Sequence, residues 1–160
     1  MTDEKRKVIE SVVPPAIFTA VIWLVWLAQL IFNTDFYWLG VYPRHLKGLY
    51  GILTSPFIHS GFDHLMSNTM PVFLLSAGIL YFYSQSAWKV ILYIYLFTGC
   101  AVWLLAGEVY HIGASGLIYG FAAFLYASGI IRRDTRAIAL ALIVTFLYGG
   151  LVWGLFALSP

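Results

Sequence analysis

The sequence has 160 residues, of which 61% are hydrophobic and only 10% are charged, and its formal net charge is +2. Soluble domains usually carry about 25% charged residues, so a chain this poor in charge lacks the polar surface of an ordinary soluble fold. The small net charge also gives no electrostatic reason to bind nucleic acid, and no nucleic-acid partner is expected. The composition therefore predicts a multi-pass membrane protein.

Five apolar segments follow one another along the chain, and each is close to the ~20 residues that a helix needs to cross ~30 Å of hydrocarbon. Such segments must be helices, because a helix satisfies its own backbone hydrogen bonds. The first is expected to begin at Pro14 and Pro15, since proline is favoured at a helix start. The segments run from about Pro14 to Phe32, His64 to Tyr83, Trp88 to Ala106, Ser115 to Ile131 and Ala137 to Phe156.

Residues 33–63, between the first two segments, are aromatic, moderately polar and interrupted by glycine and proline. The stretch is too polar to span and too long for a simple turn, and its Trp, Tyr, Arg and Lys side chains suit the membrane interface. We expect a structured interfacial loop with short helices around His45 to Leu53 and from Phe62 onward. The chain as a whole, residues 1–160, is expected to form a single domain.

The lysine and arginine residues predict the orientation. Placing the N-terminus inside puts seven of them inside and only Arg44 and Lys47 outside, which satisfies the positive-inside rule. The inside residues are Lys5, Arg6, Lys7, Lys89, Arg132, Arg133 and Arg136. We therefore expect a cytoplasmic N-terminus and an outer first loop. The small size, with no visible targeting extension, favours a bacterial inner membrane.

Polar side chains inside spanning helices are costly and are functional candidates by default. His64 and Asn68 are four residues apart and share a helix face. In the predicted topology they lie at the same depth as Ser115, which opens the fourth segment in "GASG". The structural alternative is that His64 and Asn68 form hydrogen bonds between packed helices and that Ser115 is the N-cap of its helix. The G-x-S-x-G elbow of soluble hydrolases is excluded, because it follows a strand.

Together, "HLMSN" on the second helix, "GASGLIYG" opening the fourth and the aromatic loop "YPRHLKGLYGILTSPFIHSGFDH" resemble the rhomboid family of intramembrane serine proteases. Order and spacing agree over about residues 42–120. The resemblance implies an all-α, rhomboid-like helical bundle with five transmembrane helices present of an expected six. It implies proteolysis of transmembrane substrates within the lipid bilayer, near the outer face, with no metal or cofactor.

The resemblance also implies a role for each matching position. Ser115 would be the nucleophile, and the side chains of His64 and Asn68, with the Ser115 backbone N–H, would form the oxyanion hole. Tyr119 falls where the family places an aromatic ring that stacks on the catalytic histidine. Arg44 matches an arginine of the family's first loop, and His59 would lie near the mouth of the site.

Two glycines would serve helix packing in this comparison. Gly116 and Gly120 recur one turn apart, in a small-xxx-small pattern that lets helices approach closely. The resemblance implies that they admit a sixth helix against the fourth. The bundle that we predict contains no such helix within the 160 residues.

The sequence departs from the family in one respect that concerns catalysis. Rhomboids pair the serine with a histidine from the sixth helix, whereas no histidine follows Ser115 here. The chain is expected to be truncated before that helix, because five helices would leave the Gly116 and Gly120 face unpacked. In that case the 160-residue chain itself is inactive or nearly so.

Two further explanations stay open. One is a naturally five-helix pseudoprotease that binds transmembrane helices without cutting them. The other is a different base, such as His111 four residues before Ser115, although a loop histidine is more often an interfacial residue. Neither His111 nor His64 is assigned as the base. A transporter or channel has little support, because the polar residues gather at one depth instead of lining a path across the membrane.

Overall fold

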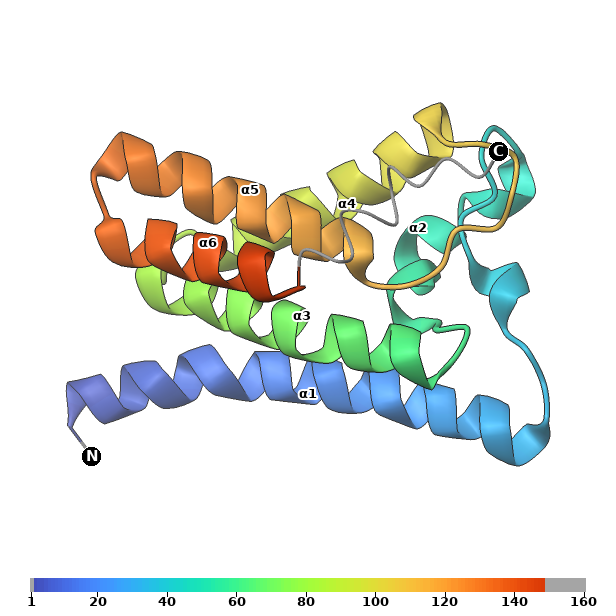
Figure 1. The fold of residues 1–160 in the computed structure, drawn as a ribbon, viewed down its shortest axis with the longest axis horizontal. Helices are drawn as coiled ribbons and strands as arrows, with labels where there is room; N and C mark the ends of the chain where they lie inside the picture. The colour runs from blue at the N-terminus through green and yellow to red at the C-terminus, as the bar shows by residue number, and fades with distance from the viewer. Residues whose placement is uncertain (1, 149–160) are drawn as a thin grey trace.

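The computed structural model describes residues 2–148 of the chain. Over that range the molecule is helical apart from its connecting segments, and the one β pairing is an isolated antiparallel bridge between Val41 and His111. The expected all-α bundle is therefore confirmed. Its elements in chain order are α1 (Asp3–Phe32), η1 (Tyr37–Leu39), η2 (Leu46–Gly48), α2 (Gly51–Thr54), η3 (Ser55–Phe57), α3 (Phe62–Phe82), α4 (Ala87–Leu105), α5 (Ser115–Arg132) and α6 (Thr135–Tyr148) (Figure 1).

Four of these helices, α1, α3, α4 and α5, are long and apolar enough to cross a membrane. The fifth predicted segment corresponds to α6, an apolar helix that is described over 14 residues. Its predicted continuation, residues 149–156, lies outside the described part of the chain. The number and order of the helices thus agree with a multi-pass bundle.

The start of α1 differs from the prediction, because Pro14 and Pro15 lie inside the helix and it begins at Asp3. Proline removes an N–H donor but has a φ that suits a helix, and membrane helices tolerate it. The earlier turns are stabilised by Asp3 and other acidic charge near the helix N-terminus and by an Arg6–Glu10 ion pair of 2.7 Å one turn apart. The prediction that the prolines start the helix is wrong.

The segment between α1 and α3 contains four short helical turns that side chains hold in place. The Gln29 amide donates to the His59 carbonyl at 2.9 Å and accepts from the Phe36 N–H at 3.2 Å. The Thr54 hydroxyl donates to the Leu39 carbonyl at 2.5 Å. These bonds satisfy backbone groups that no regular element serves, and they fix the segment against the C-terminal end of α1 and the N-terminal end of α3.

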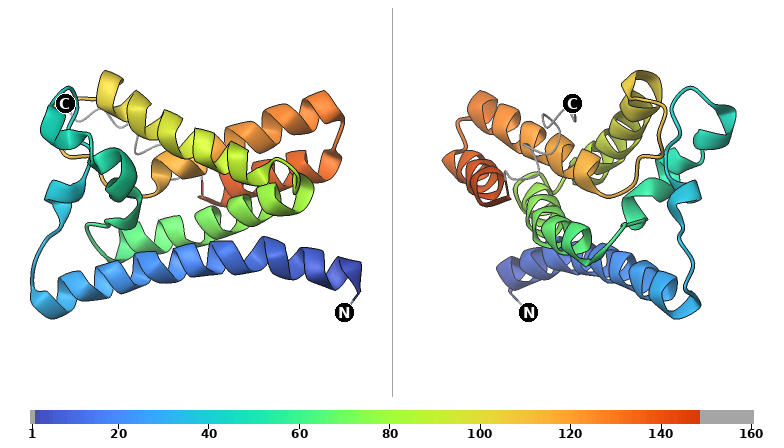
Figure 2. Two further views of the ribbon diagram at one scale, coloured as in Figure 1. Left: turned by 180° about the vertical axis from the view of Figure 1, so that it is seen from behind. Right: turned by 45° about the vertical axis from the view of Figure 1, so that its right-hand side comes forward.

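Helix α3 is the centre of the bundle. It packs on α1 along one side and on α5 and α6 along the other, while α4 packs on α5 and on α2 (Figure 2). Its inward row, Leu65, Val72, Leu75 and Ile79, is fully buried. Because lipid is as apolar as these side chains, this row stabilises the bundle by close packing rather than by leaving water.

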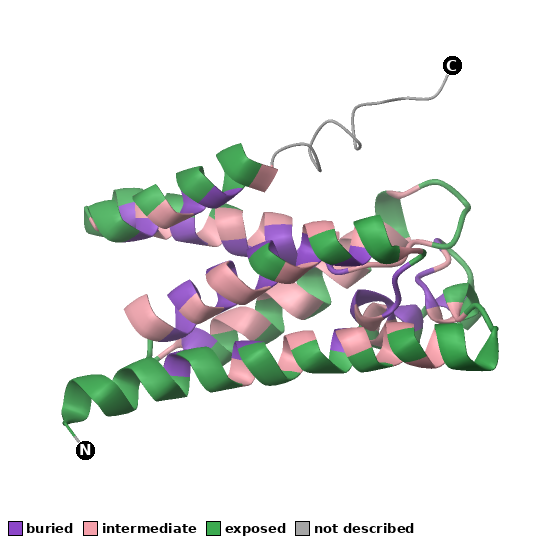
Figure 3. Ribbon diagram, turned by 60° about the horizontal axis from the view of Figure 1, so that its bottom comes forward, coloured by how far each residue is buried: buried purple, intermediate pink, exposed green. Residues whose placement is uncertain are grey.

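The outer faces of the helices carry large apolar side chains. Buried positions gather where helices face one another, and exposed positions cover the outside, most of all along α1 (Figure 3). Leu24, Phe97 and Phe146 are among these exposed apolar residues. Such a surface belongs in contact with acyl chains, so the chain is an integral multi-pass membrane protein.

Candidate functional site

Ser115 is the first residue of α5, as the sequence predicts. The chain enters this helix through Gly113, whose φ of +101° lies in a region that other residues rarely adopt. The Gly113 N–H donates to the Ser55 carbonyl at 2.9 Å, which anchors the turn to η3. The first N–H groups of a helix have no acceptor within it, so those of Ser115 and Gly116 are free to bind developing negative charge.

The His64 imidazole packs directly against the turn that leads to Ser115. A Cβ placed on Gly113 would lie 2.6 Å from Nε2 and 2.7 Å from Cε1 of His64, so only glycine leaves room for the ring. His64 lies in the first turn of α3, about fifty residues earlier in the sequence. The fold therefore brings this predicted histidine beside the serine turn.

Ser60 is a contact of this site that the sequence analysis did not identify. Its hydroxyl lies 3.2 Å from Nδ1 of His64. When Ser60 donates this bond, the imidazole proton is on Nε2, the nitrogen that faces Gly113. The signal in the sequence was the i,i+4 spacing of Ser60 and His64, but Ser60 precedes the helix, where such spacing carries no fixed geometry.

Asn68 is buried and bonded within its own helix, unlike an oxyanion donor that is open to a substrate. Its side chain is 1% exposed, and Nδ2 donates to the His64 carbonyl of its own helix at 2.7 Å. Its Oδ1 has no hydrogen-bond partner among the described residues. One amide proton of Asn68 is thus committed within α3, and the second is the only one left for a ligand.

The ring of His59 packs against the ring of His64. It is 1% exposed, the two ring centroids are 4.9 Å apart, and neither ring nitrogen has a hydrogen-bond partner in residues 2–148. Burial, together with the neighbouring His64, lowers the pKa of His59 to about 4. His59 is therefore neutral at physiological pH and presents an uncharged ring to His64.

Ser115 lines an open cavity of about 350 Å³, bordered by the start of α5, by α4 and by the loop segments before them. Tyr119 and His111 line the same cavity. Nε2 of His111 donates to the Gly107 carbonyl at 3.0 Å, since a carbonyl can only accept. In the described part of the chain, no histidine ring stacks on Tyr119, so its expected role stays a prediction.

The glycines of α5 face a helix other than the one expected. A Cβ on Gly120 would contact Cγ2 of Ile94 and would lie 3.1 Å from Cγ2 of Thr98, and a Cβ on Gly116 would lie 3.6 Å from Thr98. Both partners belong to α4. In the described part of the chain, this face is used by the crossing of α4 over α5, and the expected approach of a sixth helix stays a prediction.

Two further observations complete the description of the site. Arg44 lies in the segment between α1 and α3, where its guanidinium donates to the Ala106 carbonyl at 2.8 Å and pairs with Glu108 at 3.2 Å. It thereby ties that segment to the end of α4. Within residues 2–148, no group of three or more His, Cys, Asp or Glu side chains is arranged to hold a metal ion.

Comparison with known proteins adds an independent line of support. The family model of the rhomboid domain matches residues 46–159. An uncharacterized protein of Mycobacterium tuberculosis and one of Mycobacterium bovis are each 34% identical over 148 residues, covering 86% of this chain and 60% of the relative. An uncharacterized protein of Mycobacterium leprae is 33% identical over 149 residues, covering 86% and 57%. The chain thus spans less than two thirds of these relatives, and no solved structure matches it.

Proposed function

Because the chain belongs to the rhomboid family, we propose that it carries the serine of an intramembrane endopeptidase that cleaves transmembrane segments. The observation that carries this proposal is the packing of His64 against Gly113, two residues before Ser115. A serine at a helix N-terminus, beside an imidazole and a cavity, has the surroundings that acyl transfer needs.

In the proposed reaction, Ser115 Oγ attacks the carbonyl carbon of the scissile peptide and loses its proton to a general base. The base then protonates the leaving amine, and water hydrolyses the acyl-enzyme. The Ser115 N–H, the Nε2–H of His64 and the free amide proton of Asn68 would bind the oxyanion. Each such donor contributes about 3 kcal/mol to stabilising the transition state.

The general base of this proposal is a histidine from a sixth spanning helix, outside the 160 residues. Tyr119 would stack on it, and residues 1–160 would form one rhomboid domain that lacks its base. We also propose a bacterial inner membrane with the N-terminus in the cytoplasm, which puts Ser115 near the outer face. These assignments rest on the family resemblance and the charge distribution.

Chemical rescue tests the nucleophile without the missing helix. The purified 160-residue chain is incubated with a fluorophosphonate probe, with and without added imidazole. Attack of Ser115 Oγ on phosphorus expels fluoride, and the added imidazole takes the hydroxyl proton. We expect weak labelling alone and an increase of about tenfold or more with imidazole, since a positioned base contributes ~10²–10⁴ and a dissolved one recovers part of it.

Two variants make this experiment decisive. Ser115→Ala should abolish the imidazole-dependent label, whereas Ser128→Ala, in the same helix but far from the site, should keep it. Imidazole-dependent labelling that survives in Ser115→Ala would refute the assignment of the nucleophile. Strong labelling without imidazole would make His111, which lines the same cavity, the base to test.

A second function is favoured by the state of Asn68. Its amide is buried and bonded within its own helix, which suits packing as well as it suits catalysis. The alternative is a pseudoprotease that binds transmembrane helices without cutting them. It predicts that Ser115→Ala leaves the capture of a transmembrane peptide unchanged and that imidazole never produces labelling.

A further inference from the structure

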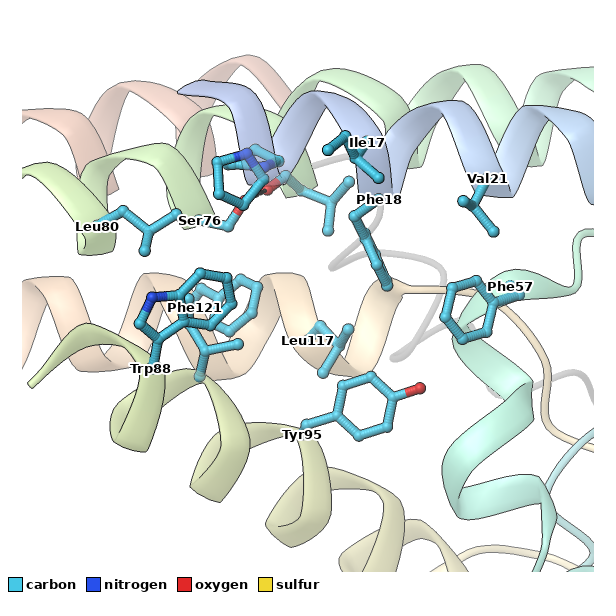
Figure 4. Close-up of a pocket in the computed structure, with 14 residues that line it drawn as sticks. Ile17, Phe18, Val21, Phe57, Ser76, Leu80, Trp88, Tyr95, Leu117 and Phe121 are labelled. Atoms are coloured by element: carbon cyan, nitrogen blue, oxygen red, sulfur yellow. Dashed lines mark hydrogen bonds between the residues drawn. The ribbon is translucent and has the colours of Figure 1, made fainter. Parts of the chain in front are cut away.

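A second cavity, of about 480 Å³, lies between α1, α3, α4 and α5 (Figure 4). Its lining is apolar apart from the indole N–H of Trp88 and two hydroxyls, and both hydroxyls are already bonded. Ser76 donates to the Val72 carbonyl at 2.5 Å, and Tyr95 donates to the Leu53 carbonyl at 2.5 Å. A buried water needs two to four polar partners, so this cavity suits hydrocarbon and not water.

The cavity follows α3 over more than two helical turns. Its lining extends from Val72 to Leu80 on α3, which at 1.5 Å per residue is about 12 Å. This length and the apolar lining suit a flexible hydrocarbon chain.

The opening faces the lipid. Ile17 on α1 and Trp88 on α4 belong to the lining and are 59% and 61% exposed. Figure 4 shows them on opposite sides of the space, with Phe121 and Leu117 of α5 between. The cavity is thus accessible between α1 and α4, two helices whose outer faces contact the bilayer.

The end of the cavity near Trp88 is positively charged. Lys89 follows Trp88, and Nζ of Lys7 lies 4.4 Å above the ring of Tyr81, next to Leu80 of the lining. This end of the bundle, formed by residues 3–10, 89 and 132–136, holds seven Lys or Arg and four Asp or Glu residues. An anionic head group at the membrane surface would be attracted to it.

We propose that this cavity is a lipid site that holds an acyl chain of an anionic phospholipid from the leaflet at the N-terminal end of α1. The apolar lining takes the chain, and the charge around Lys7 and Lys89 selects the head group. The site shares Tyr95 and Leu117 with the cavity that Ser115 lines, but no charged or nucleophilic group.

Photo-crosslinking tests the site in the full chain reconstituted in bilayers. The probe is phosphatidylglycerol with a diazirine in the middle of one acyl chain, and phosphatidylcholine with the same chain is the comparison. Mass spectrometry should map the label to buried positions within residues 72–80 and 117–121. Ile91→Trp, which fills the cavity, should reduce this label about fivefold or more, while Leu92→Trp, on the adjacent lipid-facing position, should not.

The head group is tested separately. Lys89→Gln should reduce labelling by phosphatidylglycerol and leave phosphatidylcholine unaffected, whereas Lys5→Gln, which removes the same charge further from the opening, should change neither. Label confined to lipid-facing residues such as Leu92 in the unmodified protein would overturn the site. Cross-links between two copies of the chain at the same positions would identify a protein occupant and also overturn it. Equal labelling by both lipids would overturn the anionic assignment.

Discussion

Nδ1 of the His64 imidazole lies 3.2 Å from the Ser60 hydroxyl, and Nε2 faces Gly113 in the turn that leads to Ser115. In the proposed oxyanion role, Nε2 must be the protonated nitrogen, so Nδ1 must accept from the Ser60 hydroxyl. Ser60 is then a positioning residue, which holds the tautomer and the ring without touching the substrate. The positioning role of Ser60 can therefore be tested by substituting this residue alone.

Removing the Ser60 hydroxyl should therefore weaken the site without unfolding the protein. A lost hydrogen bond of about 1 kcal/mol corresponds to a decrease of about fivefold in imidazole-rescued labelling for Ser60→Ala. Ser60→Thr, which keeps the hydroxyl, should restore most of it, and the exposed Ser84→Ala is the control. The ¹⁵N shifts of the His64 ring provide a second readout, and an unchanged tautomer with unchanged labelling would contradict the assignment.

The buried His59 predicts how stability depends on pH. Its pKa in the folded protein, about 4, lies below the 6.5 of an exposed histidine. Between these values the unfolded chain binds the proton and the folded one does not, so the free energy of unfolding falls as pH decreases. The contribution is complete above pH ~6.5 and is lost towards pH ~4, at about 3 kcal/mol in total.

Titrating the stability of His59→Phe against the unmodified chain in detergent isolates this contribution. The difference in unfolding free energy between the two should change by about 3 kcal/mol between pH 7 and pH 4, in favour of the variant at low pH. Parallel curves for His59→Phe and the unmodified chain would show that His59 does titrate normally.

At the scale of helices, α4 packs against α5 at Gly116 and Gly120, and these two positions differ in how well they accommodate a larger side chain. Gly120→Ala brings a methyl group onto the branched side chains of Ile94 and Thr98, and overpacking of this kind costs about 1–3 kcal/mol. Gly116→Ala meets Thr98 at an ordinary contact distance and gains the helix propensity of alanine, about 1 kcal/mol. We expect Gly120→Ala to lower the Tm by a few degrees and Gly116→Ala to keep or raise it, measured by tryptophan fluorescence. Equal effects would place the close approach elsewhere.

The sequence predicts the bounds of a helix where the length of an apolar segment determines them. α4 and α5 begin within one residue of their expected starts, at Ala87 and Ser115, because polar residues border the apolar runs. The start of α1 could not be predicted in this way, because its first turns are stabilised by charges and the helix continues through two prolines. The partner of Gly120 was also missed, since a small-xxx-small pattern identifies a face of a helix and not the helix that packs on it.

At the scale of the whole molecule, the distribution of charge predicts the orientation. On a Cys100→Ser background, which removes the one natural thiol, Lys47→Cys should react with a membrane-impermeant maleimide added to intact cells. Arg133→Cys should react only after the cells are opened. Both should react equally in permeabilised cells, and labelling of Arg133→Cys in intact cells would reverse the topology.

The topology also explains how much of the candidate site the sequence could predict. Helices α3 and α5 run in the same direction, so His64 and Ser115 near their starts had to lie at one depth. Contact between the His64 ring and Gly113 agrees with that argument. The burial of Asn68 and the bond from Ser60 depend on rotamers and on the loop path, which no periodicity encodes.

The bridge between Val41 and His111 limits how the site can move. The two residues exchange both backbone hydrogen bonds, at 2.9 and 2.8 Å, and two residues later the Gly113 N–H is held by Ser55. The turn that presents Ser115 is thus held at two points by the segment between α1 and α3. Amide exchange at His111 and Gly113 requires that segment to detach as well, so both amides should share one slow opening rate. In the proposed reaction, the serine turn would therefore stay in place while a substrate binds beside it.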